Sequence, residues 1–135
     1  MTTARELSQK SVAAIEAGDK EAWLALFADD AVLEDPVGVS MFDETGRGHR
    51  GKEAIGAFYD SVIAGNQVHF DVRESYGHDG EVANVVTITT TLPDGSKAIV
   101  DAVSCYRAAP DGKLASLRAL WSTDEMRFES APDAG

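Results

Sequence analysis

The sequence has only one cysteine and few positive charges. Cys105 stands alone, and a single thiol can form neither an internal disulfide framework nor a metal site of several cysteines. Twelve lysines and arginines stand against 23 aspartates and glutamates, which gives a net charge of −11. Nucleic acids and anionic membrane surfaces are bound through clustered Lys and Arg, so both are disfavoured as partners. A neutral or apolar small molecule meets no such repulsion.

Long apolar runs are also missing. No segment approaches the roughly 18 apolar residues of a membrane span. The first twenty residues carry charges throughout, unlike a signal peptide. We therefore expect a soluble, cytoplasmic protein with a reduced thiol.

Several motifs of catalysis and cofactor binding are absent. The chain contains no G-x-S-x-G, no P-loop, no G-x-G-x-x-G after a strand and no H-E-x-x-H. The three histidines, His49, His69 and His78, have no spacing that favours a metal site. We expect each to be structural or to lie on the surface, and we predict no metal site.

The first half of the chain has helical periodicity. Apolar residues recur at helical spacing over residues 4–17, 19–30 and 51–64, which predicts three helices. Gly18 is placed to end the first helix, and Asp19 is placed to cap the second.

After residue 66 the period changes to two, which is typical of strands. We predict strands over residues 68–75, 81–92, 97–108 and 113–123, all rich in Val, Ile, Thr and aromatic residues. Asp-Gly turns separate them, so neighbouring strands must be antiparallel. A further short strand, AVLED, lies between the second and third helices.

These elements predict an α+β fold in one domain. Its three N-terminal helices should pack on one face of a curved antiparallel sheet, forming a cone. A chain of 135 residues suits a single core, which we place at residues 1–128, with a loose tail at 129–135. A cone that side chains do not fill is a binding pocket.

The stretch FADDAVLEDPVG, residues 27–38, is dense in acids. It contains four carboxylates, Asp29, Asp30, Glu34 and Asp35. We expect the first two at a helix end, in water. Glu34 and Asp35 are neighbours in an extended segment and so point to opposite faces. If Ala31 and Leu33 face inward, Asp35 does too, and desolvation would raise its pKa toward that of a useful general base. The alternative is a solvent-exposed aspartate.

Two later strands have faces that could line the pocket. Val100, Ala102, Ser104 and Tyr106 share one face of the strand at 97–108, and Leu117, Ala119 and Trp121 share one face of the last strand. A slip of one residue would invert either face. For the strand at 81–92 the pattern leaves open which face is inside.

The sequence resembles bacterial ketosteroid isomerases, of the NTF2-like and SnoaL-like superfamily of cone-shaped α+β folds. The segments GDKEAWLALFADDAVLEDPVG, RGKEAIGAFYDS and DAVSCYR…DGKLASLRALWS carry the resemblance, which extends over residues 5–127. It implies an isomerase that works through a dienolate, needs no cofactor and forms a homodimer.

Position by position, the resemblance also implies roles for single residues. Asp35 matches the general base, Trp121 an aromatic residue of the pocket wall, and Tyr59 a tyrosine that supports the oxyanion site. The two oxyanion donors of the family, an aspartic acid and a tyrosine, align with Ser104 and Ser11. No tyrosine precedes Tyr59, so we expect Tyr59, directly or through water near Ser11, to supply the second donor beside Ser104.

Three functions remain open. The first is a steroid Δ5-3-ketone isomerase, with Asp35, Ser104 and Tyr59 as catalytic residues. Ser11, Ala102, Tyr106, Leu117, Ala119 and Trp121 would then contact the substrate. The second is a non-catalytic protein that binds steroids or similar flat apolar molecules, which the serines at the donor positions favour. The third is another SnoaL-like proton-transfer enzyme. In each case we expect a homodimer that pairs through the sheet.

Overall fold

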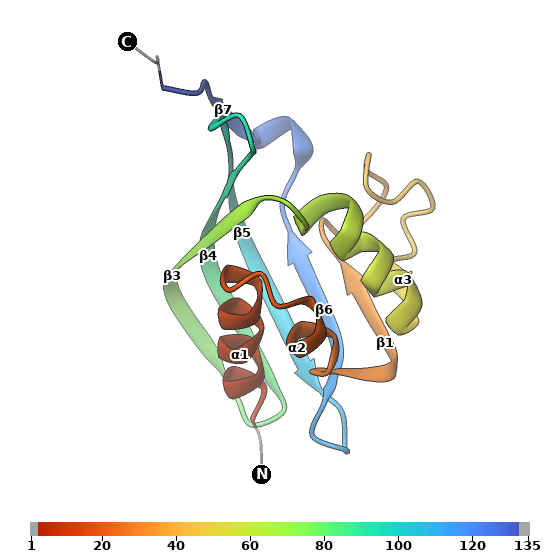
Figure 1. The fold of residues 1–135 in the computed structure, drawn as a ribbon. Coiled ribbons are helices and arrows are strands. Elements are labelled where there is room, and N and C mark those ends of the chain that lie inside the picture. Colours follow the sequence, from red (N-terminus) through yellow and green to blue (C-terminus); the bar gives the residue numbers. More distant parts are fainter. Residues whose placement is uncertain (1–2, 133–135) are drawn as a thin grey trace.

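The computed structural model describes residues 3–132 of the chain (Figure 1). The helical elements are α1 (Ala4–Glu16), α2 (Lys20–Leu24), α3 (Gly51–Phe58), the π-helical turn η1 (Tyr59–Ile63) and the 3-10 turn η2 (Thr123–Glu125). The strands are β1 (Phe27–Glu34), β2 (His49–Arg50), β3 (Gln67–His78), β4 (Glu81–Thr91), β5 (Lys97–Ala108), β6 (Leu114–Leu120) and β7 (Arg127–Glu129). The last three residues of the predicted tail lie outside the described residues.

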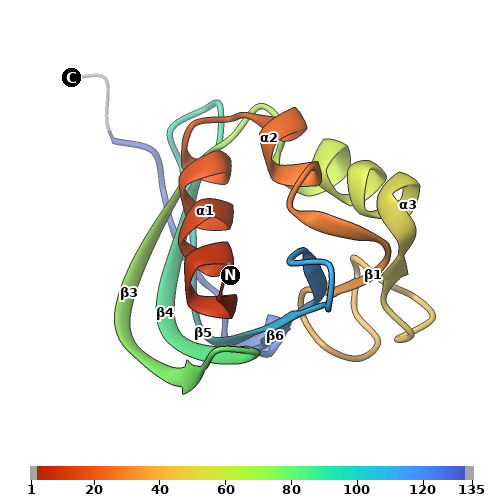
Figure 2. The same cartoon turned by 90° about the horizontal axis from the view of Figure 1, so that it is seen from below.

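The strands form one sheet in the order β2-β1-β6-β5-β4-β3. β7 pairs with the first three residues of β5, Lys97 to Ile99. β1 runs parallel to β6, while every other pairing is antiparallel. Seen from below, β3 and β4 bend around α1, and α3 lies beside β1 on the other side (Figure 2). The predicted α+β class, with helices on one face of a curved sheet, is confirmed.

The corner between the first two helices follows the sequence signals. Gly18 adopts a φ of 70°, a left-handed conformation that ends α1. Asp19 then caps α2, because its Oδ1 accepts a hydrogen bond of 3.0 Å from the Ala22 amide.

The second helix is much shorter than predicted. α2 ends at Leu24 and β1 begins at Phe27, so residues 27–30 are strand and not helix. Parallel pairing of β1 with β6 outweighs the local helical pattern. Asp29 and Asp30, expected at a helix end, are exposed residues of β1 instead.

The third helix changes its geometry midway. α3 ends at Phe58, and the next turn is π-helical, with the Ala64 amide donating to the Tyr59 carbonyl at 2.8 Å. Such turns shift the direction of the side chains that follow them. η1 thereby contributes residues to the cavity described below.

The buried residues of β4 and β5 define the inner face of the sheet. On β5 the buried residues are Val100, Ala102, Ser104 and Tyr106, which is one of the two faces distinguished from the sequence. On β4 the buried residues are Val82, Asn84 and Val86, which places Ile88 and Thr90 on the same side.

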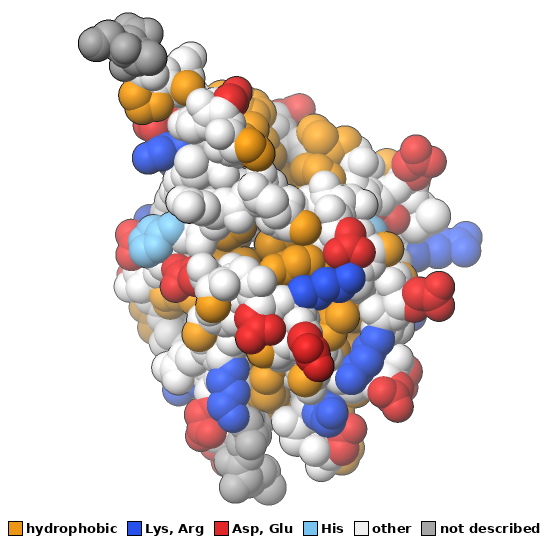
Figure 3. Space-filling model, viewed as in Figure 1, with side chains coloured by type: hydrophobic (Ala, Val, Ile, Leu, Met, Phe, Trp, Pro, Cys, Tyr) orange, Lys and Arg blue, Asp and Glu red, His pale blue; other side chains and the backbone are white. Residues whose placement is uncertain are grey.

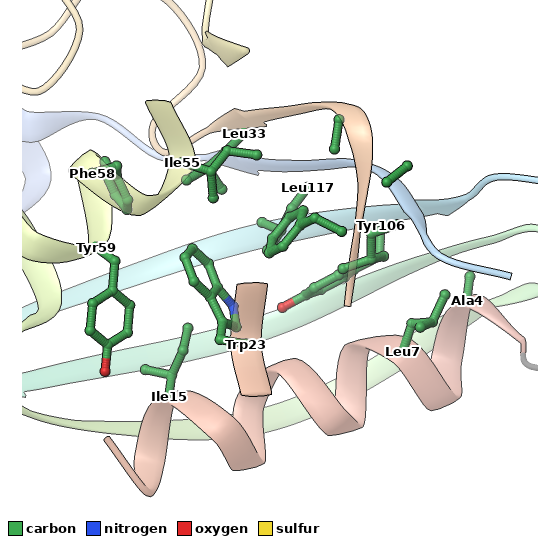
Figure 4. Close-up of a cluster of buried hydrophobic side chains, with 14 of the residues drawn as sticks. Ala4, Leu7, Ile15, Trp23, Leu33, Ile55, Phe58, Tyr59, Tyr106 and Leu117 are labelled. Atoms are coloured by element: carbon green, nitrogen blue, oxygen red, sulfur yellow. The ribbon is translucent and has the colours of Figure 1, made fainter. Parts of the chain in front are cut away.

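Most of the core lies between this face and the helices. It is built around Trp23, Phe27, Leu33, Ile55 and Leu114, all at most 1% exposed. Figure 4 shows the side chains of α1, α3 and the sheet meeting around Trp23. A second, smaller cluster of Val86, Val100 and Ala102 lies at the open end of the cone.

Candidate active site

A cavity of about 370 Å³ lies at the open end of the cone. Its walls come from the inner face of β3, β4 and β5, from η1, from the loop after β1 and from the segment around β7. Most are apolar, including Phe58, Phe70, Ile88, Val100 and Trp121. Four polar side chains also line it: Asp35, Ser61, Asn66 and Thr90. Such a cavity suits a flat, apolar ligand.

The alternation of β1 brings Asp35 to this cavity. Ala31 and Leu33 are buried, and Asp35 continues their face just after the strand ends. Glu34 points the other way and accepts a hydrogen bond of 2.7 Å from Arg118 Nε. A hydrogen bond of 2.9 Å from the Val37 amide to the Ala119 carbonyl fixes the chain beyond the turn.

Trp121 holds the Asp35 carboxylate. The indole Nε1 donates to Asp35 Oδ1 at 2.6 Å. Burial raises the pKa of Asp35 to about 6, and this hydrogen bond opposes part of that rise. The carboxyl is therefore largely ionised at neutral pH, yet basic enough to take up a proton during a reaction.

The loop between β1 and β2 covers the side of this carboxylate. Phe42 packs against Trp121 with ring centroids 6.3 Å apart. Next to it, Asp43 accepts hydrogen bonds from the amides of Thr45, Gly46 and Gly48, which lower its pKa along with the bond from the Thr45 hydroxyl. The loop is thus held by its own side chains over the site.

A polar network lies deeper in the cone. Trp23 Nε1 donates to the Ser11 hydroxyl at 2.9 Å, and Ser11 is hydrogen-bonded to Tyr106. Burial and the negative charge of Asp35 raise the pKa of Tyr106, so its phenol remains protonated. In Figure 4 the Tyr106 hydroxyl points toward the Trp23 nitrogen.

The candidate residues from the sequence fall into two groups. Asp35 and Trp121 line the cavity and touch each other. Seven are placed in the interior outside the cavity wall: Ser11, Tyr59, Ala102, Ser104, Tyr106, Leu117 and Ala119. Tyr59 packs on Trp23 at 5.6 Å, and its hydroxyl points away from that of Tyr106 (Figure 4).

Sequence reasoning did not identify several wall residues. Phe42 lies in a loop with no periodicity, so the sequence held no signal for it. Phe58 and Val62 belong to the predicted apolar stripe of the third helix, and Ile88 and Thr90 belong to a strand whose inner face was left open. For these four residues the sequence predicted the correct helix or strand, but it did not show that their side chains face a cavity.

Charge is spread over the outside of the molecule. On the face that carries α1 and α2, acidic and basic side chains are interspersed with hydrophobic ones (Figure 3). Within residues 3–132, no group of three or more His, Cys, Asp or Glu side chains is arranged to hold a metal ion. None of the helices in this part of the chain is long and apolar enough to cross a membrane.

Comparison with known proteins agrees with this architecture. The SnoaL-like domain model matches residues 9–117. A steroid Δ-isomerase of Nocardioides simplex is 32% identical over 113 residues, which cover 84% of this chain and 85% of that protein.

Two solved structures are also close. The Δ5-3-ketosteroid isomerase of a Mycobacterium species is 37% identical, with a TM-score of 0.91 over 96% of this chain and all of that one. A Mycobacterium tuberculosis protein in complex with estradiol-17β-hemisuccinate is 36% identical, with a TM-score of 0.89 over 95% of this chain and all of that one. The chain therefore belongs to the SnoaL-like family, in agreement with its resemblance to bacterial ketosteroid isomerases.

Proposed function

We propose that the protein is a steroid Δ5-3-ketone isomerase in which Asp35 is the general base. The observation that carries this proposal is a carboxylate with a pKa of about 6 in an otherwise apolar cavity, held by Trp121 at 2.6 Å. A proton-transfer enzyme needs a base of this strength at neutral pH. The similarity to steroid Δ-isomerases supports the choice of substrate.

The reaction needs no group beyond the protein and the steroid. Asp35 removes a proton from the carbon between the ketone and the double bond. The electrons of that C–H bond form a new double bond, and the carbonyl oxygen becomes the negatively charged end of a dienolate. Asp35, now a carboxylic acid, returns the proton two carbons further on. The product is the conjugated ketone, and Asp35 is again ionised.

The dienolate oxygen requires hydrogen-bond donors, and we assign these to the deep end of the cone. Ser104 is the first. For the second, we infer Tyr106 rather than Tyr59, because Tyr106 is hydrogen-bonded to Ser11 and the negative charge of Asp35 acts on its hydroxyl. Both donors lie further along β5 than Ala102, so the steroid must enter past that residue. Loss of one such donor lowers the rate by about 10²–10³.

The decisive experiment follows ultraviolet absorbance as a 5-ene-3-ketosteroid becomes the conjugated 4-ene-3-ketone. Wild-type protein is compared with Asp35→Asn, which keeps the shape of the side chain and removes the base. Turnover that collapses in the variant supports the proposal. Wild-type protein that does not exceed buffer refutes it.

The same assay separates the two tyrosines. We expect Tyr106→Phe to lose about 10²-fold or more in rate, whereas Tyr59→Phe should retain turnover near that of the wild type. The reverse pattern would restore Tyr59 as the second donor.

A non-catalytic steroid-binding protein is the second candidate. The two serines at the donor positions favour it, because a serine hydroxyl is a weaker donor than a neutral carboxylic acid or a phenol. Titration with equilenin, a phenolic analogue of the dienolate, distinguishes the two. Preference for equilenin over an apolar steroid of equal size supports an oxyanion site, and equal affinity supports simple binding. Turnover of a different carbon acid would instead indicate another SnoaL-like enzyme.

We also propose that the protein is a homodimer in the cytoplasm. The outer face of the sheet exposes Tyr76 and Leu120, which pair with Ala83 and Val103, and a second copy would cover them. Cys105 is a free thiol, which suits a reducing compartment. Light scattering coupled to size exclusion tests the dimer, and a monomeric mass at micromolar concentration would contradict it.

A further inference from the structure

The rim of the cavity has polar groups that the proposed reaction does not use. Among the four polar side chains of the wall, only Asp35 takes part in proton transfer. Ser61 already donates its hydrogen bond to the Ala57 carbonyl at 3.0 Å. Asn66 and Thr90 remain, and both face a cavity that is otherwise nearly all apolar. Polar groups in such walls commonly fix the orientation of a ligand.

The hydrogen bonds of Asn66 leave its side-chain oxygen, Oδ1, free to accept another. Its Nδ2 donates to the Val62 carbonyl at 3.1 Å, and its backbone amide donates to the Ile63 carbonyl at 3.2 Å. These bonds tie the residue to the end of η1. The side-chain oxygen, which has two lone pairs, is then available as an acceptor.

Thr90 lies on β4, the strand next to β3, at a position close to Asn66. Val68 of β3 pairs with Thr90 of β4, and Asn66 precedes β3 by one residue. Residues in this diagonal relation have Cα atoms about 7–8 Å apart, so one oxygen atom between them can contact both side chains. The Thr90 hydroxyl forms no hydrogen bond with the other residues of the 3–132 segment, and it can both donate and accept.

The separation between this pair and Asp35 is long. Trp121, which holds Asp35, follows Leu120, and Leu120 pairs with Val103 of β5. Thr90 pairs with Ala98 of the same strand. The stretch from Ala98 to the level of Trp121 is four residues of extended chain, or roughly 13 Å. Four fused rings are of this length, whereas a one- or two-ring ligand is too short.

We propose that Asn66 and Thr90 form a second polar subsite, which binds a hydroxyl group at the end of a flat polycyclic ligand remote from Asp35. The ligand hydroxyl donates to the Asn66 oxygen and accepts from the Thr90 hydroxyl. The subsite selects molecules of four fused rings with a polar group at each end. This inference rests on the proposed function only in placing the reacting carbon of the ligand, and not its ketone oxygen, at Asp35.

Calorimetric titration with two ligands tests the subsite. The probes are estradiol and 17-deoxyestradiol, which differ by the one hydroxyl group remote from the phenol. We expect the wild-type protein to prefer estradiol. Thr90→Val keeps the side-chain shape and should weaken estradiol binding about three- to tenfold, the range of one neutral hydrogen bond, while leaving the deoxy compound unchanged. Asn66→Ala should act in the same direction.

A matched control lies next to Thr90 on the same strand. Thr89 points to the opposite face of β4 and pairs with Ile99, so Thr89→Val should change neither affinity. Equal losses for both ligands in Thr90→Val, or no loss for estradiol, would overturn the subsite. Failure of both ligands to bind the wild-type protein would overturn it as well.

The outcome is separable from that of the proposed function. If the preference for estradiol over 17-deoxyestradiol depends on Thr90, but the isomerisation rate is the same in wild type and Asp35→Asn, the subsite is supported and the isomerase proposal is refuted. If Asp35-dependent turnover is found while Thr90→Val leaves both affinities unchanged, the isomerase stands and the subsite falls.

Discussion

We expect the ionised carboxylate of Asp35 to lower the stability of the folded protein at neutral pH. Its carboxyl has a pKa of 3.8 in a solvated chain and about 6 in the folded protein, because burial disfavours the charged form. Below pH 3.8 the carboxyl is protonated in both the folded and the unfolded protein, so it does not change the free energy of unfolding. Between 3.8 and 6 the unfolded chain loses the proton while the folded protein keeps it, so stability falls as pH rises.

The size of this effect follows from the difference in pKa. A difference of about two units corresponds to about 3 kcal/mol of lost stability once the pH exceeds 6. Asp35→Asn removes the ionisation and keeps an acceptor for the Trp121 indole. We therefore expect the variant to gain about 3 kcal/mol relative to wild type between pH 4 and pH 7. Most of this gain should appear between pH 4 and 6.

Urea unfolding of both proteins at a series of pH values measures the difference directly, at one fixed protein concentration. Asp30→Asn, on the exposed face of β1, gives the background effect of removing one carboxylate. Taking differences against wild type cancels the contributions of Asp43, Asp94 and Asp101, whose pKa values are lowered by hydrogen bonds. A difference for Asp35→Asn that does not change with pH would refute the reasoning.

Three further predictions concern neighbouring groups. Trp121→Phe removes the hydrogen bond to Asp35 and should move the acid limb of the kcat/KM profile up by about one pH unit or more; an unmoved limb would mean that the indole does not tune the base. Ser11→Ala leaves the buried Trp23 Nε1 without its acceptor and should cost about 1–3 kcal/mol in urea unfolding, so unchanged stability would show that another group replaces the serine. Gly48→Ala places a methyl group at φ +87° and within 2.9 Å of β1 side-chain atoms, and calorimetry should detect a loss of about 1–3 kcal/mol, whereas an unchanged Tm would contradict the strain.

Much of the fold could be predicted because its signals are local. Gly18 and Asp19 end one helix and begin the next through their own backbone and side-chain bonds. Asp-Gly turns delimit the long antiparallel strands, which match the predicted ones closely. The alternation of Ala31 and Leu33 predicted an inward Asp35 if those two residues face the core, because side-chain direction in a strand follows parity, and a solvent-exposed aspartate was the alternative.

What the sequence by itself determined was therefore the α+β class, most of the elements and the shared parity of Ala31, Leu33 and Asp35; the structure showed that this run faces inward. The tertiary structure decided that helix α2 stops at Leu24, because β1 pairs with a strand more than 80 residues away. It also decided that Trp121 donates to Asp35 across 86 positions, and that Ser11 joins Trp23 and Tyr106 in one buried network. These contacts depend on the packing of distant segments in a shared core, and no local pattern of residues encodes them.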